Sequence, residues 1–132
     1  MTDSKKLVPT TDSELLAMLA KGDLTLPLPY SREILLLARH VAGTSYRDPR
    51  EVEDELVPGV ELVLRREPDN EHDPFAIRVH YSGVHLGYVP RASNEVLARL
   101  MDAGKQIFAR IVNKEYHGDW LRLDIEIFLR EA

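Results

Sequence analysis

The residues with the most chemical potential in this chain gather between positions 66 and 77, in the stretch REPDNEHDPFAI. It holds four carboxylates, a histidine, an asparagine and two prolines between two apolar segments. Asn70 tolerates the left-handed backbone conformation, and Asp73 can accept hydrogen bonds from nearby backbone N–H groups. A structural turn explains Asn70 and Asp73, but it gives no role to Glu71 and His72. The stretch is therefore either a structural loop or a loop that presents polar groups to a ligand.

A metal site in this loop would draw on Asp69, His72 and Asp73, with His80 or His85 as a further ligand. Metal sites need three or four converging ligands, and these positions lack the helical spacing of a zinc protease motif. The chain has no cysteine, which excludes thiolate ligands, disulfides and a thiol nucleophile. No serine–histidine pattern or glycine-rich phosphate motif accompanies the carboxylates. We therefore expect no catalytic residue, no metal and no cofactor.

Alternation of apolar and polar residues predicts that β-strands surround this loop. Residues 121–129 alternate in the pattern of a strand with one buried face. Further apolar or alternating runs of strand length cover residues 34–41, 60–64, 75–79, 84–89 and 107–111. Hairpin turns are expected at residues 81–83 and 117–119. About six short strands separated by turns favour a small barrel or a strongly bent sheet.

One helix is expected after Pro90, over residues 92–103, because apolar residues recur on one side and a glycine follows. Residues 1–33 differ from the rest, since they predict a short helix followed by a proline-containing extended linker. A length of 132 residues with 44% hydrophobic residues suits one globular core. We divide the chain into a leader, residues 1–33, and one domain, residues 34–132.

The net charge of −5 argues against coating long duplex DNA, because non-specific affinity for phosphate is mostly electrostatic. Residues 48–55, however, hold five acids and one arginine, which accounts for the whole acidic excess after residue 34. The remaining body is neutral and can gather arginines on one face. The longest apolar run of the leader, residues 15–20, is too short to span a membrane or to act as an export signal. A soluble cytoplasmic protein is expected, without membrane contact.

Three segments around the loop occur together in a distinctive order. They are VAGTSY at residues 41–46, GVELVLRREPDN with DPFAIRV at residues 59–79, and LGYVPR at residues 86–91. Over about residues 34–130 the chain resembles the HIRAN domain. The resemblance implies a mainly β fold, α+β by content: a small OB-like six-stranded β-barrel with one helix after Pro90 and a short N-terminal helix. From members that remodel replication forks, it also implies a pocket for the 3′ end of single-stranded DNA.

The resemblance further suggests which residues hold the DNA. In that pocket two aromatic side chains hold the terminal base, an aspartate meets the 3′-hydroxyl, and basic and polar groups hold phosphates. Tyr46 and His72 fall on the aromatic positions, and Asp73 falls on the aspartate. The residues expected toward the phosphate backbone are Arg47, Tyr88 and Arg91.

Three functions remain open. The first is a non-enzymatic module that captures 3′ ends of single-stranded DNA in repair or replication-fork processing, with a helicase or nuclease as protein partner. The second is a protein-interaction or adaptor domain with the same barrel and little DNA affinity. It is favoured by the acidic residues 48–55 and by the leucine-rich leader, which can dock a partner or a second copy. Ser45, where DNA-binding members carry an arginine, argues against DNA binding. The third is a metal-dependent hydrolase acting on acid anhydrides or nucleic acid, since the family often occurs beside such activities.

Overall fold

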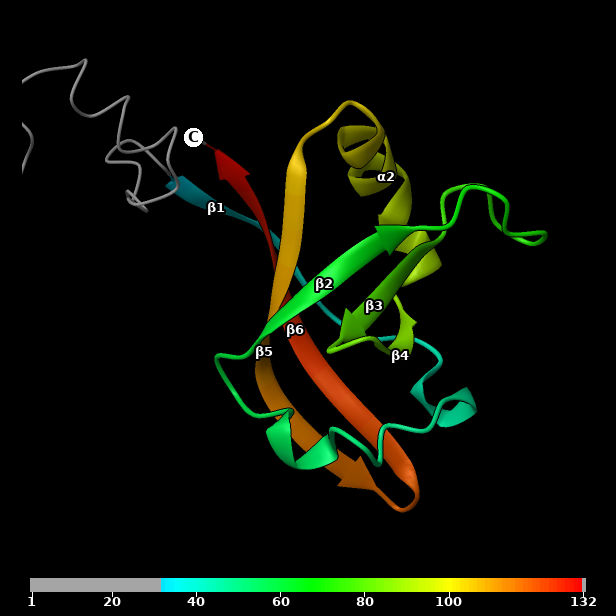
Figure 1. The fold of residues 1–132 in the computed structure, drawn as a ribbon, viewed down its shortest axis with the longest axis vertical. Coiled ribbons are helices and arrows are strands. Elements are labelled where there is room, and N and C mark those ends of the chain that lie inside the picture. The colour runs from blue at the N-terminus through cyan, green and yellow to red at the C-terminus, as the bar shows by residue number, and fades with distance from the viewer. Residues whose placement is uncertain (1–31, 132) are drawn as a thin grey trace, which may run out of the picture. The chain divides into compact units, whose positions relative to one another are not determined.

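The computed structural model describes residues 32–131, so the predicted N-terminal helix lies outside the described part of the chain. Six antiparallel strands form one sheet in the order β1-β6-β5-β2-β3-β4 (Figure 1). This confirms the mainly β prediction. The strands are β1 (Arg32–His40), β2 (Glu61–Arg66), β3 (Ile77–Tyr81), β4 (Val84–Tyr88), β5 (Gln106–His117) and β6 (Trp120–Glu131).

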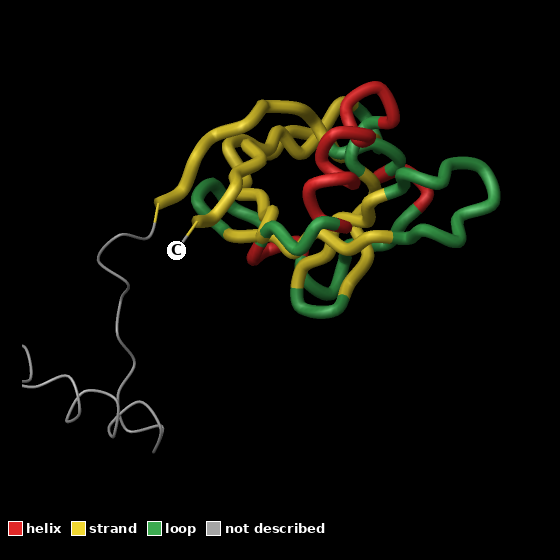
Figure 2. Tube along the Cα trace, turned by 90° about the horizontal axis from the view of Figure 1, so that it is seen from above, coloured by secondary structure: helices red, strands yellow, loops and turns green. Residues whose placement is uncertain are grey.

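The two edges of the sheet approach each other just after β1. The Val41 N–H donates to the Leu123 carbonyl in β6 at 2.9 Å, and Ala42 exchanges two backbone hydrogen bonds with Tyr88 in β4, at 2.8 and 2.9 Å. Gly87 permits this approach, because a Cβ there would overlap the Ala42 carbonyl oxygen and lie 2.7 Å from Val41 Cγ1. The predicted barrel is therefore a strongly curved sheet that is not closed by a strand ladder (Figure 2).

The helix α2 (Asn94–Asp102) follows a 3₁₀ turn, η4 (Arg91–Ser93), and lies at one end of the curved sheet (Figure 1). It begins two residues later than predicted, because the Ser93 N–H donates to the Pro90 carbonyl three residues back. Leu97 and Ala98 face the core. Between residues 32 and 131, no helix is long and apolar enough to cross a membrane.

Some strand limits differ from the predicted ones for identifiable reasons. β3 begins at Ile77 rather than Phe75, because the N–H groups of Phe75 and Ala76 both donate to Asp73, at 2.9 and 3.1 Å. β5 continues to His117, far beyond the apolar run, because its polar half pairs with β6 in a long hairpin. The first hairpin has the expected turn, with Ser82 and Gly83 both at positive φ between paired neighbours.

The core lies on the concave side of the sheet and extends under α2. Alternate residues of the strands enter it, as the period of two requires. The largest fully buried side chains come from nearly every element: Leu56, Leu62, Ile77, Leu86, Leu97, Ile111, Leu123, Ile125 and Ile127.

Candidate nucleic-acid interface

A pocket of about 410 Å³ opens where the loop between β2 and β3, the end of β4 and the start of α2 meet. Tyr46 does not line it. This tyrosine lies on the 3₁₀ turn η2 (Thr44–Tyr46), and it is 85% exposed. The other predicted residues do line the pocket: Arg47, His72, Asp73, Tyr88 and Arg91. They are joined by Ala42, Asn70, Ala76, Val89 and Asn94.

Asn70 organises the loop between β2 and β3. Its Oδ1 accepts from the N–H groups of His72 and Asp73, at 2.8 and 2.9 Å, and its Nδ2 donates to Glu67 Oε1 at 2.8 Å. Asn70 does not adopt the left-handed conformation that it tolerates, since Ser82 is the non-glycine residue with positive φ in the described chain. Asn70 bends the loop through its side chain instead.

The carboxylate of Glu67 joins the loop to both neighbouring strands, β3 and β4. It accepts hydrogen bonds from Asn70 Nδ2, from the Tyr88 hydroxyl at 2.7 Å and from Arg78 Nε at 2.8 Å. The bond from Asn70, then that from Tyr88, then the Arg78 guanidinium lower the pKa of Glu67 to about 2. Glu67 is therefore ionised at neutral pH and fixes the wall of the pocket on the side of Tyr88.

Asp73 is held by two donors from different elements. Its Oδ1 accepts from the Phe75 N–H at 2.9 Å, as the predicted turn requires, and its Oδ2 accepts from Asn94 Nδ2 at 2.7 Å. Asn94 is a buried polar residue, 3% exposed, at the first position of α2. Each carboxylate oxygen has a further lone pair, so a fixed Asp73 can still accept a hydrogen bond from a ligand.

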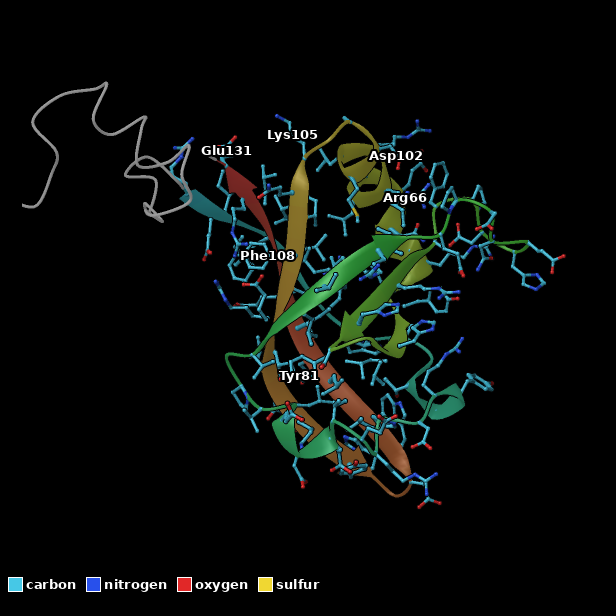
Figure 3. The ribbon with its side chains drawn as sticks, viewed as in Figure 1. Arg66, Tyr81, Asp102, Lys105, Phe108 and Glu131 are labelled. Carbon is cyan, nitrogen blue, oxygen red and sulfur yellow. The ribbon has the colours of Figure 1, made fainter. Side chains whose placement is uncertain are left out.

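Arg66 anchors the returning arm of the loop. Its Nε donates to Asp102 Oδ1 at 2.9 Å, and its two terminal nitrogens donate to the carbonyls of Ala76 and Pro74, at 2.7 and 2.9 Å. Figure 3 labels Arg66 and Asp102, which meet between the end of β2 and α2. The ion pair orients the loop relative to the helix that supplies Asn94.

The rim of the pocket carries positive charge. The Arg47 guanidinium lies 5.9 Å from the centre of the Tyr88 ring. Arg47 and Arg91 are exposed, and within residues 32–131 no carboxylate lies at ion-pair distance from either of them. Burial, and then the hydrogen bond to Glu67, raise the pKa of Tyr88, so its hydroxyl remains a donor. The pocket thus combines an internal aspartate with two exposed guanidinium groups.

The acidic residues 48–55 belong to another part of the surface. Lys114 Nζ in β5 donates to the Glu53 carbonyl at 2.9 Å and lies 3.8 Å from its carboxylate. The Tyr81 hydroxyl, at the far end of β3, donates to Glu55 Oε1 at 2.9 Å. None of residues 48–55 lines the pocket. Glu53 and Glu55 thus contact β5 and the first hairpin, and Asp48 forms an ion pair with Arg50.

The metal ligands considered from the sequence do not converge. His80 and His85 face each other on β3 and β4, whereas Asp73 and His72 line the pocket. Over the described residues 32–131, no group of three or more His, Asp or Glu side chains is arranged to hold a metal ion.

Glu67, Asn94 and Arg78 were not identified from the sequence as site residues. Apart from the bond between Asn70 and Glu67, their side-chain partners lie 11 to 21 positions away along the chain, so local spacing does not reveal them. Asn70 was recognised only as a turn residue, although its place three residues before Asp73 was a usable signal for side-chain capping of the loop.

These features define a small β domain of the OB-like class with one helix and a polar pocket beside it. The family model of the HIRAN domain matches residues 35–131. The chain therefore belongs to the HIRAN domain family.

Solved structures share this fold. A protein from Lactobacillus plantarum is 26% identical, with a TM-score of 0.69, and the match covers 77% of this chain and 99% of that one. The HIRAN domain of human HLTF is 23% identical, with a TM-score of 0.57, over 74% of this chain and 78% of that one.

A curated relative is a Fanconi-associated nuclease 1 homolog of Oryza sativa subsp. japonica. It is 46% identical over 52 residues, which is 36% of this chain and 5% of that protein. This chain therefore corresponds to a small part of that relative.

Proposed function

We propose that this chain is a DNA-binding module that captures the 3′ end of single-stranded DNA in the pocket beside α2. The observation that carries the proposal is the fixed carboxylate of Asp73, which Asn94 and the Phe75 N–H hold inside a pocket with Arg47 and Arg91 at its rim. A fixed acceptor beside exposed cations suits a ligand that has a hydroxyl at its end and phosphates behind it.

Different side chains contact the hydroxyl, the base and the phosphates of the ligand. Asp73 accepts a hydrogen bond from the 3′-hydroxyl and repels a 3′-phosphate. The rings of His72 and the exposed Tyr46 offer flat surfaces to the terminal base, which any base can use. Arg47 and Arg91 face the phosphates. Tyr88 donates its one hydroxyl proton to Glu67, so it serves the backbone side of the pocket through its ring, which lies beside the Arg47 guanidinium.

Family membership supports a binding role rather than a catalytic one. The similarity to a Fanconi-associated nuclease 1 homolog favours a setting in DNA repair. In that setting any hydrolysis belongs to a helicase or nuclease partner, and this chain supplies recognition of the strand end.

The test compares four labelled DNAs by fluorescence anisotropy at low salt: one strand with a 3′-hydroxyl, the same strand with a 3′-phosphate, a blunt duplex and a circular single strand. We expect the hydroxyl end to bind about tenfold more tightly than the others, which corresponds to one hydrogen bond to a charged acceptor. Asp73→Asn keeps the shape of the side chain but removes its charge, and should abolish the preference over the 3′-phosphate.

Asp69→Asn is the matched control, since Asp69 is an exposed carboxylate of the same loop that does not line the pocket. It should leave the preference unchanged. Equal binding of hydroxyl and phosphate ends by the native protein would refute end recognition. If none of the four DNAs binds, the adaptor function becomes the better explanation.

A further inference from the structure

The convex face of β2, β3 and β4 carries two arginines and two histidines in neighbouring rows. Residues that pair directly across antiparallel strands share a face of the sheet. Arg65 pairs with Arg78, and Arg78 pairs with Tyr88, which forms one row across the three strands. The neighbouring row takes one residue from each of the same strands in turn: Val63, His80 and His85.

The first row places two arginines directly opposite each other. Such a like-charged pair is unfavourable in a sheet unless an anion lies between or above the two charges. Glu67 neutralises Arg78 with a salt bridge. Arg65 is exposed, and no carboxylate of residues 32–131 lies at ion-pair distance from it. An anion from outside the described chain would complete this surface.

The second row includes two flat rings. His80 and His85 stack with their centroids 5.1 Å apart and 5° between their planes, and His85 packs edge-on against Tyr88 at 5.0 Å. His80 Nε2 is buried without a hydrogen-bond partner. Burial, then Arg65 and Arg78, lower the pKa of His80, while burial and then Arg47 lower that of His85. Burial is the main cause of the lowered pKa of both histidines, and the nearby arginines add to it.

This face is continuous with the pocket. Tyr88 ends the arginine row and lines the pocket, and Arg47 lines the pocket while lying over the Tyr88 ring. In Figure 3, the labels Arg66 and Tyr81 mark the pocket end of β2 and the far end of β3, between which the face extends. A chain that leaves the pocket past Tyr88 meets Arg78 and then Arg65.

We propose that the convex face of β2, β3 and β4 is a second binding surface, which takes the phosphate backbone of the nucleic-acid strand that leads away from the pocket. The proposal rests on the function proposed for the pocket and adds the path that the bound strand takes as it leaves the pocket. Arg65 is its principal phosphate contact, because Glu67 already neutralises Arg78. Because this surface contacts phosphates, it adds affinity with strand length and not preference for an end.

The experiment compares a trinucleotide with a dodecanucleotide, each with a 3′-hydroxyl, for the native protein and for Arg65→Gln. We expect the native protein to bind the longer strand more tightly. Arg65→Gln should weaken binding of the dodecanucleotide about fivefold and lower its salt slope by about 0.7, the value of one phosphate contact on a single strand. Binding of the trinucleotide and its 3′-hydroxyl preference should not change.

Lys105→Gln is the control, because it removes one exposed positive charge at the turn between α2 and β5, away from this face. Equal affinity for both lengths in the native protein, or equal effects of the two substitutions, would overturn the proposed surface. If length dependence and the Arg65 effect persist without a 3′-hydroxyl preference, the surface stands and the pocket function fails. If no strand binds, both proposals fail.

Discussion

Glu67 lies outside the pocket lining, yet its carboxylate joins the loop, β3 and β4. Glu67→Gln should lower the free energy of unfolding at pH 7 by about 1–2 kcal/mol, because the buried network loses a charged acceptor and Arg78 loses its counterion. The pKa of Glu67 in the folded protein, about 2, lies below its ordinary value of 4.5. Its stabilisation is therefore complete above pH 4.5 and disappears as the pH falls toward 2.

Urea unfolding of the native protein and Glu67→Gln at pH 7, 4 and 2.5 measures this difference. The difference in the free energy of unfolding between the two proteins should become smaller as the carboxylate of Glu67 in the native protein becomes protonated. Glu71→Gln, an exposed carboxylate in the same loop, provides the comparison and should show no gap. A gap for Glu67→Gln that is the same at all three values would show that shape, and not charge, is the source of the stabilisation.

For single residues, the sequence predicted the hydrogen bonds between positions that are close together along the chain. The capping of Phe75 N–H by Asp73 is visible from two residues of spacing. The bond between Asp73 and Asn94 joins positions 21 residues apart, and its formation depends on where α2 packs. For the same reason no sequence pattern indicated that Glu67 would accept from Tyr88.

Among the elements, β4 depends most on one small residue. A Cβ at Gly87 would overlap the Ala42 carbonyl oxygen, and its φ of 155° is in a region that other residues rarely adopt. Gly87→Ala should lower the free energy of unfolding by about 2–3 kcal/mol, as overpacking against fixed backbone does. Thermal unfolding of the variant measures this loss.

Gly118→Ala separates the cost of steric overlap from the cost of an unfavourable backbone conformation. Gly118 also has positive φ, at 65°, but nothing lies within 4 Å of the position that a Cβ would take there, so only the backbone conformation is penalised. That variant should lose about 1 kcal/mol. Equal losses at the two positions would show that the approach of Ala42 does not constrain β4.

The elements themselves were well predicted where hydrophobic patterns exist. In β6, partly exposed and buried residues alternate from Trp120 to Ile127, and the sequence showed this alternation directly. The polar half of β5 has no such pattern, because pairing with β6, and not burial, makes it a strand. Equally, the meeting of Ala42 with Tyr88 depends on the curvature of the whole sheet.

For the whole molecule, we expect residues 32–132 to fold without the leader. The buried residues of the core cluster lie between Val41 and Ile127, Leu36 and Leu37 of β1 pack against them, and β1 begins at Arg32. Removal of residues 1–31 should change the melting temperature by less than about 4 °C, the shift that 1 kcal/mol causes in a domain of this size. Calorimetry of the two proteins tests this boundary.

A second deletion, of residues 1–40, is the matched control because it also removes β1 from its pairing with β6. That protein should fail to fold. A large loss of stability on removal of residues 1–31 alone would show that the leader contributes to the core, and would contradict the division of the chain near residue 33.

The bridge between Ala42 and Tyr88 has a consequence for how binding is transmitted. Arg47 follows one side of this seam along the chain, and Asp73 and Tyr88 lie on the other side. A strand end that is bound as proposed would contact residues on both sides of this seam. By thermodynamic linkage it would then stabilise the contact between the two sheet edges, and a partner that separates the edges would weaken strand binding by the same free energy.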